Sequence, residues 1–284
     1  MKITLVYNPE SGSSRPLSEL RRLFEAHNIT ISEAIQVKKG FMAQLKTPIK
    51  NCEYIAVIGG DGTISSIAGL IAGTEATLIP LPGGTLNHFT KDLGVDQDLE
   101  IAIKNIKAAK PRHVDVASVN GLFFINNSSI GMYPASLHAR KRLEDTLGKW
   151  PAAIIGSLRA LMRYRTYDVT INNEHLTTPF VFVGSNDYKL DTFGPTGRES
   201  LTEGILSVYI LNSKTRRGLV KVFVHALTGQ LHILSDFIAF KTTSLTITSR
   251  HTRLSVSRDG EVSHLTTPLT YKTEKVRLKV LSGS

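Results

Sequence analysis

The fold is decided by residues 54–64, Tyr-Ile-Ala-Val-Ile-Gly-Gly-Asp-Gly-Thr-Ile. The apolar, β-branched run Tyr54 to Ile58 predicts a buried strand, Gly59 and Gly60 end it, and the small apolar residues 64–72 predict a helix. Glycines in such a turn let a ligand approach the backbone closely. The free N–H groups at the start of the helix favour an anion, typically phosphate. The turn by itself is equally well explained as an ordinary strand-to-helix connection with a helix-capping Asp.

Asp61 and Thr63 give this turn its polar groups. A carboxylate beside bound phosphates would repel them. Asp61 is therefore expected to act through a Mg²⁺ ion that lies between them, or on the proton of a phosphoryl acceptor. The hydroxyl of Thr63 can add a further contact.

A second stretch, residues 77–94, has the same organisation, Thr-Leu-Ile-Pro-Leu-Pro-Gly-Gly-Thr-Leu-Asn-His-Phe-Thr-Lys-Asp-Leu-Gly. It predicts a strand, a Gly-Gly-Thr turn and a helix that stops at Gly94. One helix and one return strand fit between the two motifs, so their strands are predicted to be parallel neighbours. Both glycine turns then lie at the carboxyl edge of one sheet, where open α/β sheets bind ligands.

Composition limits the class of protein. The 284 residues, 41% hydrophobic and 20% charged, are typical of a globular chain with one large domain or two modest ones. The chain shows neither a signal peptide nor an apolar run long enough to span a bilayer, and the single cysteine, Cys52, fits a reducing cytoplasm. The nine histidines lack metal-site spacing, so no zinc site is predicted.

The net charge of +10 and the pI of about 9.7 predict an anionic partner. Nucleic acid is ranked last, because no nucleic-acid motif is present and aromatic residues make up only 7% of the chain. Residues 140–165 combine seven Lys and Arg side chains with Trp150. This segment predicts peripheral contact with an anionic membrane at its inner face. Its apolar residues fit packing into the protein core equally well.

Strand and helix patterns alternate up to about residue 112 and then change. The first part predicts a strand at Lys2 to Tyr7, a helix from Pro16 to His27, a strand at Ile29 to Val37, and helices at 41–50 and 98–109. Next comes a β-hairpin with Asn120-Gly121 at its turn. Short strands follow at Tyr167–Asn172, Phe180–Gly184, Ile205–Leu211, Ser244–Ser249, Leu254–Ser257, Leu269–Lys272 and Val276–Leu281, with helices at 135–147, 150–164 and 215–231. We therefore expect an α/β domain with a mostly parallel sheet over residues 1–112 and a β-sandwich domain with a few helices over residues 113–284.

The two glycine motifs together closely resemble the diacylglycerol kinase catalytic-domain family, which includes bacterial lipid kinases and sphingosine kinases. The likeness extends over nearly the whole chain. It implies an α/β nucleotide domain, a β-sandwich domain and an active site in the cleft between them. In longer members the C-terminus returns to the first domain, and here that return is expected to be short or missing.

The resemblance also implies which residues bind ATP. The stretch Asn8-Pro9-Glu10-Ser11-Gly12 matches the Asn-Pro-x-Ser-Gly of the family, so it is expected to join the two glycine turns. The implied nucleotide-binding residues are Asn8, Pro9, Ser11, Gly12, Gly59, Gly60, Asp61, Gly62, Thr63, Gly84, Thr85 and Asn87.

Two further stretches match motifs in the second half. Residues 198–206 resemble an Asp-Asp-Gly stretch that holds a structural Mg²⁺ in bacterial members, which implies Glu203, Ser200 and Ile205 as ligands. Arg258-Asp259-Gly260-Glu261 matches the Asp-Gly-Glu motif and implies Glu261, assisted by Asp259, as general base. Both acids share one face if the strand continues through Gly260. Asp-Gly is also a common turn pair, and a hairpin turn with solvated acids is the alternative.

These observations predict an ATP- and Mg²⁺-dependent lipid kinase, with diacylglycerol as the first candidate acceptor and Glu261, Asp259 and Asp61 as catalytic residues. A kinase with a soluble acceptor, such as an NAD kinase, is the second hypothesis. A weakly catalytic nucleotide- or lipid-binding relative is the third, because Ser65, Ser66, His88 and Glu203 depart from the usual motifs. A homodimer is left open.

Overall fold

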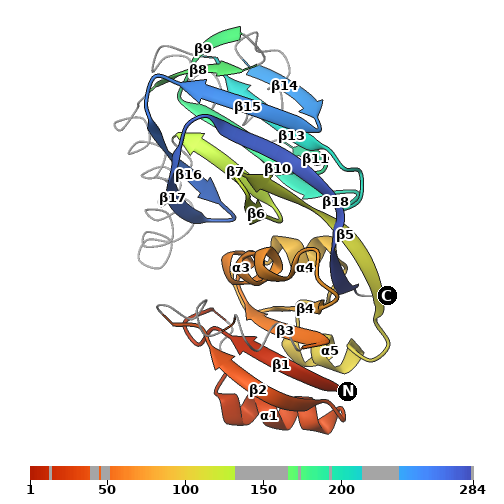
Figure 1. Ribbon diagram of the computed structural model, residues 1–284. Helices are drawn as coiled ribbons and strands as arrows, with labels where there is room; N and C mark the ends of the chain where they lie inside the picture. The colour runs from red at the N-terminus through yellow and green to blue at the C-terminus, as the bar shows by residue number, and fades with distance from the viewer. Residues whose placement is uncertain are drawn as a thin grey trace, which may run out of the picture.

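The computed structural model describes residues 1–12, 15–38, 45, 52–131, 166–171, 174–191, 194–212 and 237–282, and only the backbone of 189–191 and 194–197. The helices predicted at 135–147, 150–164 and 215–231, the predicted helix at 41–50 apart from Leu45, and the basic segment 140–165 lie outside these residues. Figure 1 shows an α/β layer structure at the N-terminal end and a β-rich half above it.

The N-terminal half is built on four adjacent parallel strands in the order β2-β1-β3-β4. These strands are β1 (Lys2–Tyr7), β2 (Thr30–Gln36), β3 (Tyr54–Gly59) and β4 (Thr77–Pro82), and the helices are α1 (Leu17–Ala26), α3 (Asp61–Ile71), α4 (His88–Asp92) and α5 (Leu99–Asn105). In Figure 1, α3 and α4 cover the sheet face toward the β-rich half, and α1 and α5 cover the other face. The parallel pairing of the strands before the two glycine turns is confirmed.

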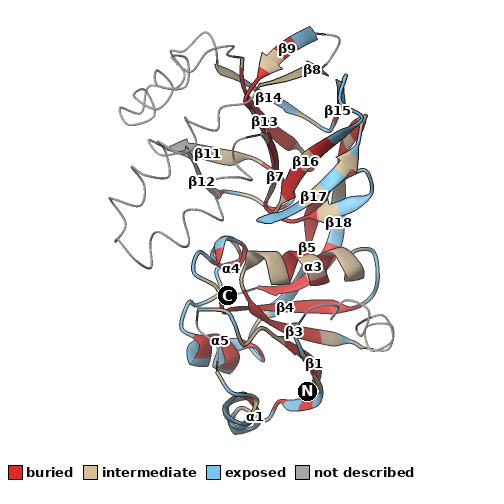
Figure 2. Cartoon of the chain, turned by 90° about the vertical axis from the view of Figure 1, so that its left-hand side faces the viewer, coloured by how far each residue is buried: buried red, intermediate tan, exposed pale blue. Residues whose placement is uncertain are grey.

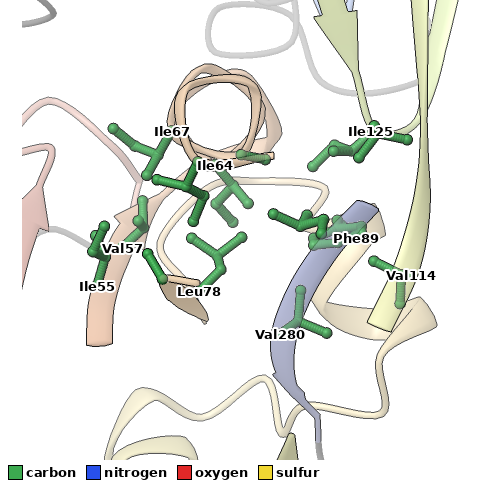
Figure 3. Packing of buried hydrophobic residues seen from close by; sticks show 14 of the residues in the cluster. Ile55, Val57, Ile64, Ile67, Leu78, Phe89, Val114, Ile125 and Val280 are labelled. Atoms are coloured by element: carbon green, nitrogen blue, oxygen red, sulfur yellow. The ribbon is translucent and has the colours of Figure 1, made fainter. Parts of the chain in front are cut away.

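Strand β3 is buried on both faces. Ile55 and Val57 pack in one apolar cluster with Ile67 of α3 (Figure 3), whereas Ile58 packs in a second cluster with Phe24 of α1. All five side chains are at most 1% exposed, so both clusters are fully closed to water. Coverage of both faces is the usual reason that parallel strands read as continuous apolar runs.

The C-terminal half is a β-sandwich, and the predicted fold class is confirmed. Its strands are β5 (Lys110–Val119), β6 (Leu122–Phe124), β7 (Asn127–Gly131), β8 (Tyr167–Ile171), β9 (Glu174–Thr178), β10 (Phe180–Ser185), β11 (Tyr188–Asp191), β12 (Gly194–Arg198), β13 (Leu206–Leu211), β14 (Phe237–Thr242), β15 (Ser244–Ser249), β16 (Arg253–Arg258), β17 (Glu261–Thr266) and β18 (Leu269–Ser282). Within the described residues, one antiparallel sheet has the order β14-β13-β10-β7-β16-β17. Its apolar face packs against β18, β15 and β8 in a third cluster, and Figure 2 shows these inner faces buried.

Strand β18 connects the two halves. It pairs antiparallel with β15 and β5, and near its end it pairs in parallel with β4, where Lys279 faces Thr77 and Val280 faces Leu78. The sequence predicted two strands here, but the structure has one, with an irregularity between Glu274 and Leu278. The return of the C-terminus to the first domain, which was expected to be short or missing, is therefore present, and the last part of β18 makes it.

The domain boundary expected at residue 112 falls inside β5, which pairs along much of its length with β18. The connection between the halves is thus a pair of hydrogen-bonded strands (Figure 1). The expected division into 1–112 and 113–284 stays a prediction.

Candidate active site

Three loops meet at the carboxyl edge of the parallel sheet. A Cβ built on Gly84 would lie 2.5 Å from Cα of Gly60, so the two glycine turns touch backbone to backbone and position 84 has no room for a side chain. A Cβ on Gly60 would lie 3.6 Å from Cα of Gly84, an ordinary contact distance. A Cβ on Gly12 would lie 3.7 Å from Oγ1 of Thr85, which places the loop after β1 beside the second turn. The structure therefore brings together the three stretches from which the nucleotide-binding residues were predicted.

Several of the predicted residues in these loops hold the loops in shape. The side-chain oxygen of Asn87 accepts the Gly84 N–H at 2.9 Å, with Asn87 itself in a left-handed conformation at φ 51°. The side-chain oxygen of Asn8 accepts the Glu10 N–H at 3.0 Å, and the Ser11 hydroxyl donates to the Asn8 carbonyl at 2.7 Å. These local bonds fix the turns from which backbone N–H groups can be offered to a ligand.

Helix α3 begins at the first glycine turn. Its N-cap residue is Gly60, which has no capping side chain, so the first N–H groups are not covered by a local acceptor from that residue. Thr63 packs directly beneath the turn, since a Cβ on Gly59 would lie 2.8 Å from Cβ of Thr63. The helix starts at Asp61, three residues before its predicted start at 64, because the glycines are followed at once by helical backbone.

Asp61 connects the two glycine turns. Its Oδ2 accepts the His88 N–H at 3.1 Å, and its Oδ1 accepts the Phe89 N–H at 3.0 Å, both at the start of α4. The Nδ2 of Asn126, from the C-terminal half, donates to Oδ1 at 3.3 Å. Asp61 is thus a helix-capping acid, as the alternative explanation predicted, but it caps α4 and not α3, the helix in which it lies. Its predicted action at the phosphates stays a prediction.

Asp259 and Gly260 form a tight turn between β16 and β17, with Arg258 paired to Glu261 and with φ angles of 45° and 90° at the two turn residues. The condition that the strand continues through Gly260 is not met. The alternative of a hairpin turn is right about the backbone, although Asp259 is not a solvated acid.

The Asp259 carboxylate is 8% exposed and faces inward. Its Oδ1 accepts the N–H groups of Asn126 and Asn127, both at 2.9 Å, and its Oδ2 accepts the Ile125 N–H at 2.8 Å. The hydroxyl of Ser65, on α3, also donates to Oδ2. Burial raises the pKa of Asp259 above its ordinary value, against the opposing effect of these four donors.

Glu261 is exposed and leans over the start of α3. Its Oε1 accepts the Ser66 hydroxyl at 3.2 Å, and the same oxygen would lie 3.7 Å from a Cβ on Gly62. The two serines that depart from the usual motif therefore each contact one acid of the Asp-Gly-Glu turn. The arrangement leaves Glu261 open to solvent beside the first glycine turn and encloses Asp259.

The predicted structural metal ligands are each engaged within the protein. Glu203 Oε2 accepts the Asp187 N–H at 3.2 Å, the Ile205 carbonyl accepts the Asn186 N–H at 2.9 Å, and the Ser200 hydroxyl lies 3.3 Å from that of Thr202. Among the described residues no group of three or more His, Cys, Asp or Glu side chains is suited to hold a metal ion. The predicted metal site at Glu203, Ser200 and Ile205 stays a prediction.

Two side chains that sequence reasoning did not assign to the site are Asn126 and Arg198. Asn126 immediately precedes β7, and with Asn127, Ser128 and Ser129 of that strand it forms a polar run. Arg198 is buried and contacts both Asp92 of α4 and Asn126. An arginine inside a turn-rich, polar stretch carries no local signal that it will be buried.

Residues 2–119 match the family described as "Diacylglycerol kinase catalytic domain". A Staphylococcus haemolyticus protein named "Putative lipid kinase SH2167" is 26% identical over 98% of this chain and 95% of its own length. An Escherichia coli protein named "Probable lipid kinase YegS" is 29% identical over 55% of this chain and 54% of its own.

A solved structure titled "Crystal structure of a putative diacylglycerol kinase from Bacillus anthracis str. Sterne" aligns with a TM-score of 0.77 at 25% identity and covers 99% of this chain and 97% of that one. Together with the family match, this confirms the resemblance predicted from the two glycine motifs. No helix among the described residues is both long and apolar enough to cross a bilayer.

Proposed function

Since residues 2–119 belong to the diacylglycerol kinase catalytic-domain family, we propose that the protein is an ATP- and Mg²⁺-dependent lipid kinase. It transfers the γ-phosphoryl group to the hydroxyl of an amphipathic alcohol, with diacylglycerol as the first candidate and phosphatidic acid as the product. Lipid-kinase-like character follows from the comparisons, and the acceptor, the nucleotide and the metal are the proposed parts.

The observation that carries the proposal is the meeting of groups from both halves at the start of α3. Asp61 comes from the first glycine turn, and Glu261 reaches the same helical turn from the C-terminal half, 3.7 Å from a Cβ on Gly62. Phosphoryl transfer needs positioning and charge neutralisation more than covalent chemistry. Backbone donors on one side can position the phosphates, and the solvent-facing carboxylate on the other side is within reach of an acceptor hydroxyl.

The residues around the glycine turns fit a nucleotide. The steric closeness of Gly60 and Gly84 leaves a backbone-lined surface, and the N–H groups at the start of α3, which receive no side-chain cap from Gly60, favour phosphate oxygens. A Mg²⁺ ion held at this turn would supply the charge neutralisation. Asp61 provides a carboxylate at this turn. Its Oδ2 accepts one hydrogen bond, and we assign this oxygen to the Mg²⁺ ion or to the proton of the acceptor hydroxyl.

Glu261 is proposed as the general base. An alcohol is a weak nucleophile at neutral pH, and a carboxylate within reach takes its proton as the bond to phosphorus forms. The Ser66 hydroxyl holds one oxygen of Glu261, which leaves the other for the acceptor. Asp259 assists by fixing the turn that carries Glu261 rather than by contact with the acceptor, because its oxygens are taken by four donors.

Transfer of label from γ-labelled ATP to a panel of lipid alcohols in mixed micelles tests the proposal. Label in phosphatidic acid supports it. Label only in NADP would replace the lipid acceptor by a soluble one, and no transfer to any acceptor would favour a binding protein. The cytoplasmic, membrane-peripheral location is part of the same proposal and is supported by the net charge of +10.

A further inference from the structure

Arg198 is a buried charge that joins the two halves of the molecule. It lies at the end of β12, and its guanidinium donates to Asp92 Oδ2 of α4 at 2.8 Å and to the carbonyls of Ile125 at 2.5 Å and Ser185 at 3.3 Å. It also donates to Oδ1 of Asn126 at 2.8 Å. A planar guanidinium that donates to four different acceptors has a fixed orientation.

The same guanidinium lies 5.4 Å from the ring centre of Tyr188 and 6.0 Å from that of Phe89, within reach of cation–π attraction. Burial acts to lower the pKa of Arg198, but its electrostatic interactions with Tyr188 and Asp92 outweigh this and leave the pKa raised. An arginine side chain is not deprotonated in proteins, so Arg198 remains a donor and a positive charge.

This fixed donor decides which way the Asn126 amide points. An arginine side chain is only a hydrogen-bond donor, so it can bond to the amide oxygen but not to the amide NH₂ group. The Nδ2 of Asn126 is consequently turned toward Asp61, whose Oδ1 lies 3.3 Å away. With the amide reversed, an NH₂ group would face the guanidinium and an oxygen would face the Asp61 carboxylate, and both contacts are repulsive.

The Asp61 carboxylate is in turn held by three donors, the Asn126 amide and the N–H groups of His88 and Phe89. Two of the three bonds go to Oδ1, so the carboxylate plane is fixed and Oδ2 keeps the greater free capacity. Loss of the amide donor removes one of the two bonds to Oδ1 and loosens the carboxylate, which the His88 and Phe89 N–H groups then hold alone. A misplacement of this kind at a reacting group commonly costs about 10²-fold in rate.

We propose that Arg198 is a positioning residue for phosphoryl transfer, which sets the orientation of the Asp61 carboxylate through the side-chain amide of Asn126. This inference rests on the proposed kinase function for its effect on rate, but the geometry it describes exists without substrate. The competing explanation is that Arg198 only stabilises the junction by its ion pair with Asp92.

The most direct variant is Asn126→Asp. It keeps an oxygen toward Arg198, replaces the donor toward Asp61 by a second oxygen, and adds a negative charge beside Asp61, so it reverses the last contact of the chain. Arg198→Lys keeps a positive charge for Asp92 but lacks the fork that reaches Asn126. Val208→Ala is the matched control, because Val208 is fully buried in the apolar cluster of the same half.

Four measurements are made on each full-length variant: melting temperature, kcat, the Mg²⁺ concentration for half-maximal rate, and hydrogen exchange of the His88 and Phe89 backbone amides. Asn126→Asp is expected to lower kcat about 10²-fold, to raise the Mg²⁺ requirement, and to speed exchange at both amides. Arg198→Lys is expected to do the same, and the double variant to lose no more than either single one. Val208→Ala is expected to lower the melting temperature alone.

A wild-type kcat and Mg²⁺ requirement in Asn126→Asp would overturn the inference, and so would an Arg198→Lys variant that resembles Val208→Ala in every readout. Additive losses in the double variant would also overturn it, since they would place the two side chains on separate routes. If the wild-type protein transfers phosphate to no acceptor, the proposed function fails. Amide exchange then decides the inference alone, and unchanged exchange at His88 and Phe89 in Asn126→Asp overturns it.

Discussion

Replacement of Asp259 by Asn tests whether this acid holds the junction together. The wild-type carboxylate accepts the N–H groups of Ile125, Asn126 and Asn127 and the Ser65 hydroxyl. An amide has one oxygen and one NH₂ group. If the amide oxygen keeps the hydrogen bonds from the Asn126 and Asn127 N–H groups, the NH₂ group faces the Ile125 N–H and the Ser65 hydroxyl.

The hydroxyl of Ser65 can rotate and accept a bond from the new NH₂ group, but the Ile125 N–H can only donate. One buried donor is therefore left without an acceptor, which costs about 1–3 kcal/mol of unfolding free energy. Urea unfolding of both proteins measures this difference through the shift in midpoint at constant slope. Glu261→Gln, two residues away on an exposed side chain, is the control and is expected to stay within about 0.5 kcal/mol of wild type.

The pH dependence has a definite sign. Because burial raises the pKa of Asp259 in the folded protein above its ordinary value of 3.8, the folded state binds this proton more tightly than the unfolded state does. The contribution to stability is therefore complete below that ordinary value and is lost as the pH rises through the folded pKa. The stability advantage of wild type over Asp259→Asn is expected to be larger near pH 4 than at pH 7.

Three results would refute this reasoning. Unchanged unfolding free energy in Asp259→Asn would mean that the backbone donors find other partners. A large fall in kcat at wild-type stability would mean that Asp259 takes part in the chemistry directly. An advantage of wild type that shrinks toward pH 4 would contradict the assigned direction of the pKa.

Further predictions concern the chemistry and the membrane. Glu261→Gln is expected to lower kcat by about 10²–10⁴-fold with nucleotide affinity nearly intact, and a fall of less than about threefold would exclude the general-base role. Asp61→Asn is expected to slow transfer and change its Mg²⁺ dependence; wild-type values for both would exclude the assignment. Gly84→Ala, whose Cβ would lie 2.5 Å from the facing turn, is expected to raise the KM for ATP, whereas Gly69→Ala, whose Cβ has 3.4 Å to its nearest neighbour, is the control in steady-state kinetics. Residues 140–165 are expected to bind anionic vesicles in a salt-sensitive way in sedimentation, and indifference to both lipid charge and salt would refute this.

Local sequence pattern predicted the parts of the fold that local chemistry decides. The apolar runs before the glycines became β3 and β4, and Asn120-Gly121 became the hairpin turn, with φ angles of 49° and 78°. Each of these depends on residues close together in the chain. The adjacency of the two glycine turns also followed, because a crossover between parallel neighbours leaves few alternatives.

The errors in the prediction come from places where tertiary contacts override the local pattern. The charged run around Glu274 was predicted as a break, but a bulge lets β18 continue through it, with Val276 at φ 44°. The buried carboxylate of Asp115 accepts the Val276 N–H at 2.7 Å and so holds the bulge from the opposite strand. Strand β7 was missed because its residues are polar, although Ser128 and Ser129 are fully buried. Such burial depends on which distant segment packs against the residue.

The Asp-Gly-Glu turn shows how two acids two residues apart come to differ. In a continuous strand both carboxylates would share one face and one environment. The left-handed backbone at Asp259 instead turns one acid inward, against Ser65 and the backbone at 125–127, and presents the other outward, against Ser66. Because the inward acid fixes the turn that carries the outward one, the geometry supports a division of labour in which Asp259 acts on the reaction through the placement of Glu261 rather than by contact with the acceptor. Kinetics of Glu261→Gln at wild-type stability, beside Asp259→Asn at reduced stability, would separate the two roles.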